Sequence, residues 1–318
     1  MIIHDIINVL NASKKIAITF HVSPDGDSLG SSLALMLGLK SNHKDVYIVT
    51  KDNLPETYSF LPSYNEIIIS EGTILDDTDC VVVIDCGNLE RVSANLNLKL
   101  KAYNLINIDH HITNEFYGDL NLVNTNSAAT GEIIYELLNS MGVNIDKNIS
   151  VCLYTSIIAD TGGFKHSNTT ADTHKIAGKL INNDINFSDI HRIVFENKKF
   201  KRLKLIAKAI DGMYLINNIC VIKLTKNMLD EIGIEASDTS DIISIGGSID
   251  TIEVTVLFRE TDEGIKVSLR SKSIVDVRKI AESFGGGGHI RASGLLINKS
   301  LAEAEHIIIK AIEKELIK

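Results

Sequence analysis

The segment HVSPDGDS places one imidazole and two carboxylates within seven residues. His21, Asp25 and Asp27 follow a short apolar run, and a proline and a glycine between them let the backbone turn. Nitrogen and oxygen donors at this density are typical of a metal site. The alternative is a solvated turn in which Asp27 or Ser28 caps the next helix.

Two further aspartates end apolar runs. Asp85 ends VVVID, where a carboxylate is unfavourable unless it faces a cation or hydrogen-bond donors; otherwise it caps a loop. Asp160 ends the helix-like run SVCLYTSIIAD, where a negative charge opposes the helix dipole by up to about 1 kcal/mol. Asp160 therefore requires a compensating partner, unless it is a helix-end carboxylate without function.

The triplet Asp109, His110 and His111 follows another apolar run. Neutral imidazole is a common metal ligand, and a neighbouring carboxylate can orient one of the rings. Because consecutive side chains of an extended chain point to opposite sides, the two histidines have different roles. We expect His110 to bind metal and His111 to contact substrate.

A glycine-rich motif, FGGGGHIRASG, lies near the C-terminus. Gly286, Gly287 and Gly288 precede His289, and such a backbone can present several N–H groups to a phosphate. The alternative is a flexible loop. Arg270, at the end of a strand-like run, is either a bidentate phosphate clamp or a surface charge.

Strand-like and helix-like segments alternate in the first half of the chain. Strands are predicted at 16–20, 46–49, 80–84 and 105–108, and helices at 29–39, 130–138 and 149–158. This alternation predicts a mostly parallel sheet with helices on its faces. Ligands of such sheets bind beyond the carboxyl ends of the strands, where these aspartates and histidines occur.

The second half has a different pattern. Residues 170–197 are helical and polar, a basic helix follows at 198–210, strands are predicted at 219–224, 251–259 and 265–270, and an amphipathic helix spans 300–318. At 318 residues, two domains are expected. We predict an α/β protein with a catalytic domain at 1–185, a helical connector at 186–212 and a smaller α/β substrate-binding domain at 213–318.

Composition narrows the class of protein. Hydrophobic residues make up 44% and charged residues 23%, as in globular proteins. No apolar stretch approaches the roughly 20 residues of a membrane span, and the four distant cysteines indicate reduced thiols, so we expect a cytoplasmic protein. A net charge of −9 disfavours a protein that binds long duplex nucleic acid, whereas a short anionic substrate beside bound cations is compatible with it.

Together, HVSPDGDS, VVVIDCGN, the DHH triplet, IIADTGG and GGGGHIRASG resemble the successive motifs of the DHH phosphoesterase superfamily, over nearly the whole chain. The glycine-rich motif resembles the DHH-associated C-terminal domain. At this length, the arrangement is most similar to members that act both as an oligoribonuclease and as a phosphatase of 3′-phosphoadenosine 5′-phosphate (pAp).

The resemblance implies two divalent metal ions, most often Mn²⁺, with Mg²⁺ or Co²⁺ as substitutes. It implies a first ion held by His21, Asp25 and Asp85, and a second held by Asp27, Asp85, His110 and Asp160. It further implies that His111 approaches the scissile phosphate, while Arg270, His289 and the preceding glycines hold the substrate. Asn114, in DHHITN, either contacts substrate or caps the following turn.

The expected activity is hydrolysis of short oligoribonucleotides to mononucleotides and of pAp to AMP, by a homodimer in which two metals activate a bridging water. Aromatic residues make up only 5% of the chain and Trp is absent, so there are enough aromatic side chains to stack on the bases of only a few nucleotides. Alternatives are a phosphodiesterase of linear dinucleotides, a manganese-dependent inorganic pyrophosphatase, and a non-catalytic nucleotide sensor. The glycine-rich motif argues against the pyrophosphatase, and the complete ligand set argues against the sensor.

Overall fold

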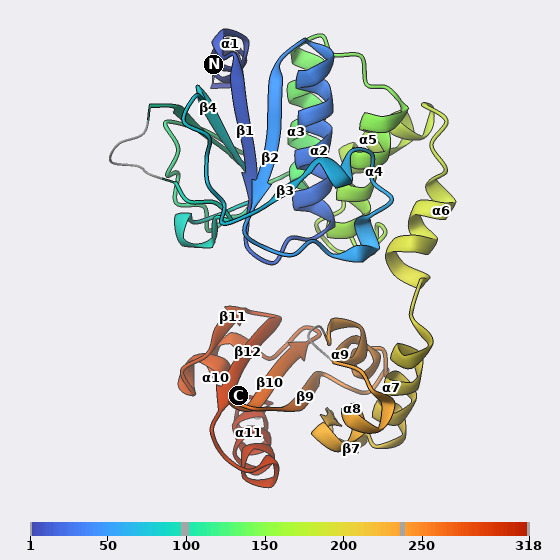
Figure 1. The fold of residues 1–318 in the computed structure, drawn as a ribbon. Coiled ribbons are helices and arrows are strands. Elements are labelled where there is room, and N and C mark those ends of the chain that lie inside the picture. The colour runs from blue at the N-terminus through green and yellow to red at the C-terminus, as the bar shows by residue number, and fades with distance from the viewer. Residues whose placement is uncertain (1, 97–101, 236–238, 317–318) are drawn as a thin grey trace. The chain divides into compact units, whose positions relative to one another are not determined.

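The computed structural model describes residues 2–96, 102–235 and 239–316. The chain forms two compact units, the first ending at Asn197 and the second beginning at Lys198 (Figure 1). Each unit is built on its own six-stranded sheet. Among the described residues, no helix is long and apolar enough to span a membrane.

The sheet of the first unit is parallel throughout, with the strand order β3-β2-β1-β4-β5-β6. Its strands are β1 (Lys15–Phe20), β2 (Asp45–Thr50), β3 (Ile68–Ile69), β4 (Cys80–Ile84), β5 (Asn104–Asp109) and β6 (Leu120–Val123). The chain places β2 on one side of β1 and β4 on the other. This change of direction opens a binding position at the carboxyl ends of β1 and β4.

Helices cover one face of this sheet, whose central strands are apolar on both faces. They are α1 (Ile2–Ala12), α2 (Gly26–Ser41), α3 (Thr130–Ser140), α4 (Lys147–Asp160), α5 (Ala171–Ile181) and α6 (Phe187–His191), followed by a π-helical turn, η4 (Arg192–Glu196). Ile16, Ile18 and Phe20 of β1 face the larger core, which α2, α3 and α4 complete. Ala17 faces a smaller core on the opposite side.

The packing of α2 on α4 depends on Gly30. A Cβ atom there would lie 2.5 Å from the Cys152 carbonyl oxygen and 2.9 Å from the Ser156 nitrogen, both backbone atoms of α4. We expect Gly30→Ala to lower the free energy of unfolding by about 1–3 kcal/mol through overpacking. Gly178→Ala, on the exposed side of α5 with nothing within 4 Å, is the matched control and should be neutral or stabilising.

Urea denaturation of both variants measures these changes. Equal stability of Gly30→Ala and the wild type would contradict the close helix contact. The contact at Gly30 also bears on function, because Ser156 donates a hydrogen bond to Asp27, a candidate metal ligand.

The second unit has the strand order β11-β12-β10-β9-β8-β7, in which only β8 and β9 are parallel among the described strands. Its strands are β7 (Tyr214–Ile216), β8 (Ile219–Leu224), β9 (Val254–Thr261), β10 (Gly264–Ser271), β11 (Gly287–His289) and β12 (Ala292–Ile297). Its helices are α7 (Phe200–Asp211), α8 (Lys226–Ile232), α9 (Ser240–Gly247), α10 (Val277–Ser283) and α11 (Leu301–Leu316).

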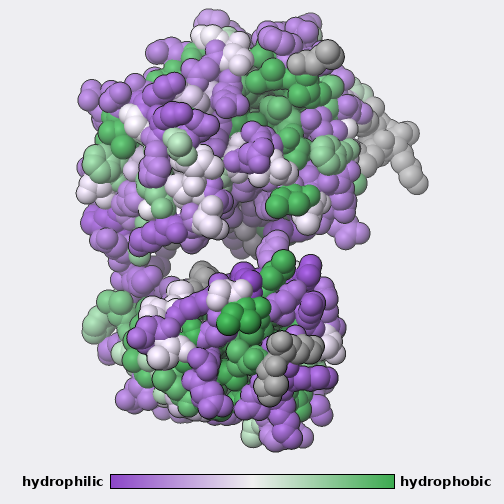
Figure 2. All heavy atoms as spheres, turned by 180° about the vertical axis from the view of Figure 1, so that it is seen from behind, coloured by the Kyte–Doolittle hydropathy of each residue, from purple (hydrophilic) through white to green (hydrophobic). Residues whose placement is uncertain are grey.

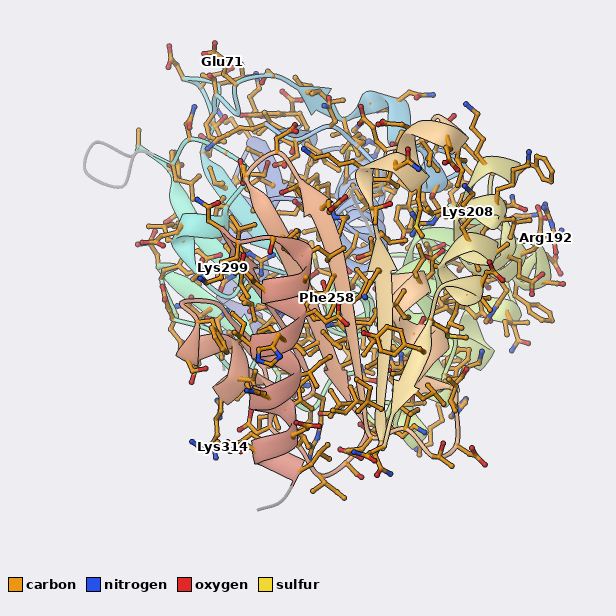
Figure 3. All side chains as sticks on the ribbon, turned by 90° about the horizontal axis from the view of Figure 1, so that it is seen from below. Glu71, Arg192, Lys208, Phe258, Lys299 and Lys314 are labelled. Atoms are coloured by element: carbon orange, nitrogen blue, oxygen red, sulfur yellow. The ribbon has the colours of Figure 1, made fainter. Side chains whose placement is uncertain are left out.

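Two apolar cores flank this second sheet. One face packs on α10 and α11, with Phe258 near the middle of the unit and Lys299 and Lys314 at its surface (Figure 3). The other face packs on α7 and α9 over β8 and β9. Hydrophilic residues predominate on the face of the molecule in Figure 2, with smaller apolar areas among them.

The predicted α/β class is confirmed, with a parallel sheet first and a smaller mixed sheet second. Outside the predicted elements lie the helices α1, α8, α9 and α10 and the strands β3, β6, β7, β11 and β12. The glycine-rich motif is not the flexible loop that was considered as the alternative, because Gly287, Gly288 and His289 form the edge strand β11 against β12. An edge strand still leaves one row of backbone N–H groups without a strand partner.

Candidate metal centre

The loop after β1 brings His21 and Asp25 together. Asp25 caps α2, since its Oδ1 accepts from the backbone N–H groups of Asp27 and Ser28, both at 3.0 Å. Its Oδ2 lies 3.7 Å from His21 Nε2. The His21 ring makes its other contact, 2.8 Å, from Nδ1 to the Val22 carbonyl oxygen. Capping and ligand roles are therefore compatible in one carboxylate, with one oxygen for each.

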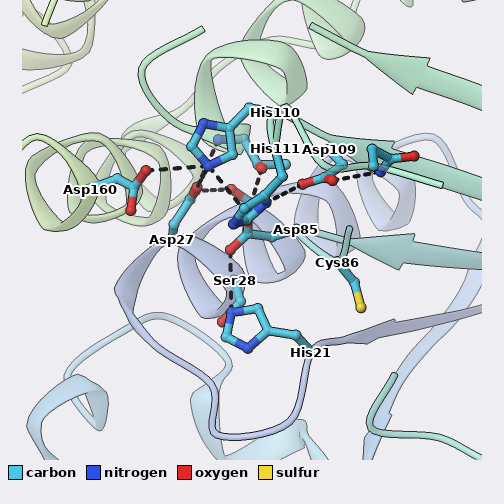
Figure 4. Close-up of polar contacts among 12 residues, drawn as sticks. His21, Asp27, Ser28, Asp85, Cys86, Asp109, His110, His111 and Asp160 are labelled. Atoms are coloured by element: carbon cyan, nitrogen blue, oxygen red, sulfur yellow. Dashed lines mark hydrogen bonds and ion pairs between the residues drawn. The ribbon is translucent and has the colours of Figure 1, made fainter. Parts of the chain in front are cut away.

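Asp85 lies between two groups of potential ligands. Its side chain is buried, Oδ2 is 3.4 Å from His21 Nε2, and Oδ1 is 3.6 Å from His110 Nε2 (Figure 4). Its backbone has φ of 56°, in the left-handed region, and its N–H donates to the Ile108 carbonyl oxygen on β5 at 2.9 Å. An aspartate adopts this conformation at some cost, which the strand pairing on both sides of β4 offsets.

Asp27 is a fully buried carboxylate between α2, α3 and α4. It accepts hydrogen bonds from the backbone N–H groups of Thr130 (2.8 Å) and Gly131 (3.2 Å), and from the hydroxyls of Ser31 (2.9 Å) and Ser156 (2.5 Å). These donors, two of them at the N-terminus of α3, compensate for burial of the carboxylate.

His110 completes the second side of the site. Its Nε2 lies 3.3 Å from Asp160 Oδ2 and 3.8 Å from Asp27 Oδ2, while Nδ1 is 3.2 Å from the Ser127 carbonyl oxygen. Protonation at Nδ1 leaves Nε2 free to bind a cation, a common arrangement for histidine ligands. Asp160, the last residue of α4, thus faces the partner that its position at the helix end requires.

The six predicted metal ligands converge at the carboxyl ends of β1, β4 and β5. They form a first ligand group, His21, Asp25 and Asp85, and a second ligand group, Asp27, His110 and Asp160; in each, the ligand atoms lie within 4.8 Å of one another. Oxygen and imidazole nitrogen donors suit Mn²⁺, Mg²⁺ or Co²⁺. The residues present therefore fit divalent metal ions, and Asp85 directs one oxygen to each group.

Burial and neighbouring charges shift the pKa values of several of these residues. Burial, with the carboxylates of Asp85 and Asp160 nearby, raises the pKa of Asp27 well above its usual value. Burial likewise raises the pKa of Asp160 to about 6, although the His110 imidazole opposes the shift. Against its burial, His21 has its pKa raised to about 10 by the adjacent carboxylates. Without a cation, these shifts favour the protonated forms of Asp27, Asp160 and His21.

The Asp109 carboxylate orients His111. Asp109 is fully buried, and its Oδ1 lies 2.7 Å from His111 Nδ1. This pairing raises the pKa of His111 and, against burial, lowers the pKa of Asp109. Of the two rings that Asp109 could orient, the structure therefore assigns it His111. Because Nδ1 is engaged, Nε2 is the ring atom available to a substrate.

Asn114 is buried and holds Asp109 in place. Its Nδ2 donates to Asp109 Oδ2 at 2.6 Å and to Asn107 Oδ1 at 2.8 Å, while its Oδ1 accepts from the Phe116 N–H at 2.7 Å. This last bond caps the turn after the DHH triplet. The placement favours capping and positioning over contact with substrate, the other role considered for this residue.

The predicted substrate-binding residues of the second unit lie in neighbouring strands. Arg270 of β10 and His289 of β11 both pair with Ala292 of β12, one from each side. Side chains that lie opposite one another in antiparallel strands share a face of the sheet. Arg270, His289 and Ala292 therefore lie in a row on the face opposite α10 and α11, because Leu269 faces those helices. Gly286 packs tightly on Leu295 and the Gly294 carbonyl oxygen, where a Cβ atom would clash.

Several positioning residues were not predicted from the sequence. Ser31, Thr130, Gly131 and Ser156 surround Asp27, and the Thr130 hydroxyl also donates to Asp85 Oδ1 at 3.0 Å. The available signal was weak: small and hydroxylated residues inside otherwise apolar helices. Such residues are just as often neutral helix positions, so their role becomes clear only when α2, α3 and α4 are brought together.

Comparison with known proteins agrees with this geometry. Residues 15–157 match the family described as DHH family, N-terminal domain, and residues 217–318 match the DHHA1 domain. The chain is 30% identical over 308 residues to the bifunctional oligoribonuclease and PAP phosphatase NrnA of Thermus thermophilus, an alignment covering 95% of this chain and 90% of that protein. It is 31% identical over 310 residues to the protein of that name from Bacillus subtilis, covering 96% of each.

A solved structure is similar over both units. The exopolyphosphatase-related protein from Bacteroides fragilis has a TM-score of 0.90 and 28% identity, and the match covers 98% of this chain and 96% of that one. The similarity therefore extends beyond the motifs to the whole described fold.

Proposed function

Because the chain belongs to the DHH family and carries a DHHA1 domain, we propose that it is a divalent-metal phosphoesterase that hydrolyses short oligoribonucleotides to mononucleotides and pAp to AMP. The observation that carries the proposal is the position of Asp85, which lies 3.4 Å from His21 Nε2 with one oxygen and 3.6 Å from His110 Nε2 with the other. A shared carboxylate is what a two-metal hydrolase requires to hold its ions close together.

The donor set supports Mn²⁺ as the ion of both positions, with Mg²⁺ or Co²⁺ as substitutes. His21, Asp25 and Asp85 would hold the first ion, and Asp27, His110 and Asp160, with the second oxygen of Asp85, the other. When bound, such ions supply Lewis acidity toward phosphoryl oxygens and water.

His111 and Asp109 supply the remaining chemistry of the first unit. Asp109 Oδ1 lies 2.7 Å from His111 Nδ1, which leaves Nε2 of this half-buried ring available to a substrate. A protonated His111 can donate this proton to the leaving oxygen, and the Asp109 carboxylate, which raises the pKa of His111, favours that protonated form. Asn114 keeps the Asp109 carboxylate in position for this role.

The row formed by Arg270, Ala292 and His289 is the proposed binding surface for substrate phosphate and ribose in the second unit. A guanidinium binds phosphate with two parallel hydrogen bonds, and the small Ala292 between the two larger side chains leaves room for a ligand. Residues 1–185 are the proposed catalytic domain, 186–212 the connector, and 213–318 the substrate-binding domain.

The test is release of mononucleotide from a labelled RNA dinucleotide and trinucleotide, and of phosphate from pAp, with Mn²⁺ and with excess chelator. We expect turnover of these substrates with Mn²⁺ and none after chelation. Inorganic pyrophosphate is the comparison substrate, and hydrolysis of pyrophosphate alone would contradict the proposal. A labelled 20-nucleotide RNA duplex serves as the negative control for long nucleic acid.

A further inference from the structure

The turn that precedes α3 lies behind His110. The Ser127 carbonyl oxygen, 3.2 Å from His110 Nδ1, fixes the ring so that Nε2 faces Asp27, Asp85 and Asp160. The orientation of this ligand therefore depends on where the Ser127 carbonyl points. A carbonyl in a turn has no strand or helix ladder to hold it, so other groups must fix the turn.

Two side chains hold this turn at the next residue, Ala128. Glu132 Oε2 accepts from the Ala128 N–H at 3.1 Å, and Asn168 Nδ2 donates to the Ala128 carbonyl oxygen at 2.9 Å. Glu132 is only 5% exposed, so its carboxylate is placed inside the protein at a desolvation cost. Both polar backbone groups of Ala128 are thus bonded to side chains.

The same two side chains connect the turn to the rest of the second ligand group. Asn168 Nδ2 also lies 3.2 Å from the carbonyl oxygen of Asp160, so it links the turn to the end of α4. Glu132 lies in the first turn of α3, whose Thr130 and Gly131 N–H groups donate to Asp27. His21 and Asp25, by contrast, are held by the loop after β1.

We propose that Glu132 and Asn168 are positioning residues that set the affinity of the second ligand group for its metal ion, without touching metal or substrate. The inference rests on the proposed metal binding but not on the proposed substrates. Outer residues that orient a metal-bound histidine typically change metal affinity by about 10–100-fold. Metal affinity should therefore fall at the second ligand group and stay unchanged at the first.

The competing explanation is that Glu132 only caps α3, because its bond to the Ala128 N–H also satisfies a free donor near the helix start. A cap alone would change the stability of the metal-free protein and leave the ratio of the two metal affinities unaltered. The two explanations therefore differ in a quantity that can be measured without any turnover.

The experiment is a titration of the metal-free full-length chain with Mn²⁺, in which free Mn²⁺ is followed by its electron paramagnetic resonance signal. Glu132→Leu and Asn168→Ala should each weaken one of two binding steps by about 10–100-fold and change the other by less than about twofold. Glu132→Gln keeps an acceptor for the Ala128 N–H and should bind both ions like the wild type. Glu136→Leu, on the exposed side of α3, is the matched control and should also bind like the wild type.

Thermal unfolding of the same variants without metal identifies loss of folding. A folded Glu132→Leu protein with both wild-type affinities would overturn the inference, as would equal weakening of both steps or wild-type binding of fewer than two ions. If the predicted pattern is found but no RNA or pAp is hydrolysed, the inference stands and the proposed substrates are wrong. The two hypotheses therefore fail separately.

Discussion

Asp85→Asn is expected to abolish hydrolysis of RNA dinucleotides and pAp, with a loss of at least about a thousandfold, or about 4 kcal/mol of transition-state stabilisation. The substitution removes the negative charge that lies 3.4 Å from His21 Nε2 and 3.6 Å from His110 Nε2. Because each ligand group faces one oxygen of Asp85, Mn²⁺ affinity should fall at both positions. Initial rates and Mn²⁺ titration measure the two effects.

The same variant should still be folded without metal, although it loses the attraction between Asp85 and His21. Asp85 repels the buried carboxylates of Asp27 and Asp160, and an amide removes this repulsion while it can still accept from the Thr130 hydroxyl. Added Mn²⁺ should then raise the unfolding temperature of the wild type and not of the variant. Asp172→Asn, an exposed carboxylate that pairs with Lys175, is the matched control. Normal turnover by Asp85→Asn would contradict the assignment of the metal centre.

After metal removal, the free energy of unfolding is expected to depend on pH between about 4 and 6. Asp27 and Asp160 have folded-state pKa values above their ordinary value of 3.8, about 6 for Asp160. A group with a raised pKa contributes stability below its unfolded pKa and loses that contribution as pH rises through its folded pKa. The chelated protein should therefore become less stable as pH rises from about 4 to about 6.

Asp25 and His21 change the stability of the protein outside this pH window. Against the desolvation of the cluster, the His21 hydrogen bond lowers the pKa of Asp25 to about 2, so its stabilising contribution is already complete above pH 3.8. The pKa of His21 is raised to about 10, so its contribution is lost only above pH 6.5. The carboxyl groups with raised pKa values, the buried Glu132 among them, therefore account for the loss of stability expected as pH rises from 4 to 6.

With Mn²⁺ bound, the stability of the protein should instead rise with pH. Each ion must displace the protons held by the crowded carboxyl groups, so apparent affinity should rise about tenfold per pH unit for each displaced proton. Unfolding temperatures measured from pH 4 to 7, with chelator and with saturating Mn²⁺, should diverge as pH rises. Two parallel curves would show that these carboxyl groups do not hold the metal.

The ligands were predictable from the sequence because the carboxyl ends of parallel strands meet at one edge of the sheet. His21, Asp85 and His110 each come directly after an apolar strand run, so their convergence is a consequence of sheet topology. Asp27 was identifiable from the density of donors in HVSPDGDS, and Asp160 because a charge at the end of an apolar helix requires a partner.

Other features depend on tertiary contacts that no local pattern encodes. The left-handed backbone of Asp85 is fixed by its bond to Ile108 on the adjacent strand. Three of the donors to Asp27, namely Thr130, Gly131 and Ser156, are more than one hundred positions away in the sequence. The strand at Gly287–His289 was not predicted because glycine weakens the strand signal, and its pairing with β12 overrides that local preference.

The shared carboxylate also has a consequence for how such proteins diverge. Since one side chain faces both ligand groups, a single codon change at position 85 is expected to remove turnover in one step. Arg270 and His289 are unaffected by that change, because they belong to the second unit and its own sheet. Gene duplication followed by this one substitution therefore offers a short route from a phosphoesterase to a receptor that senses the same nucleotides.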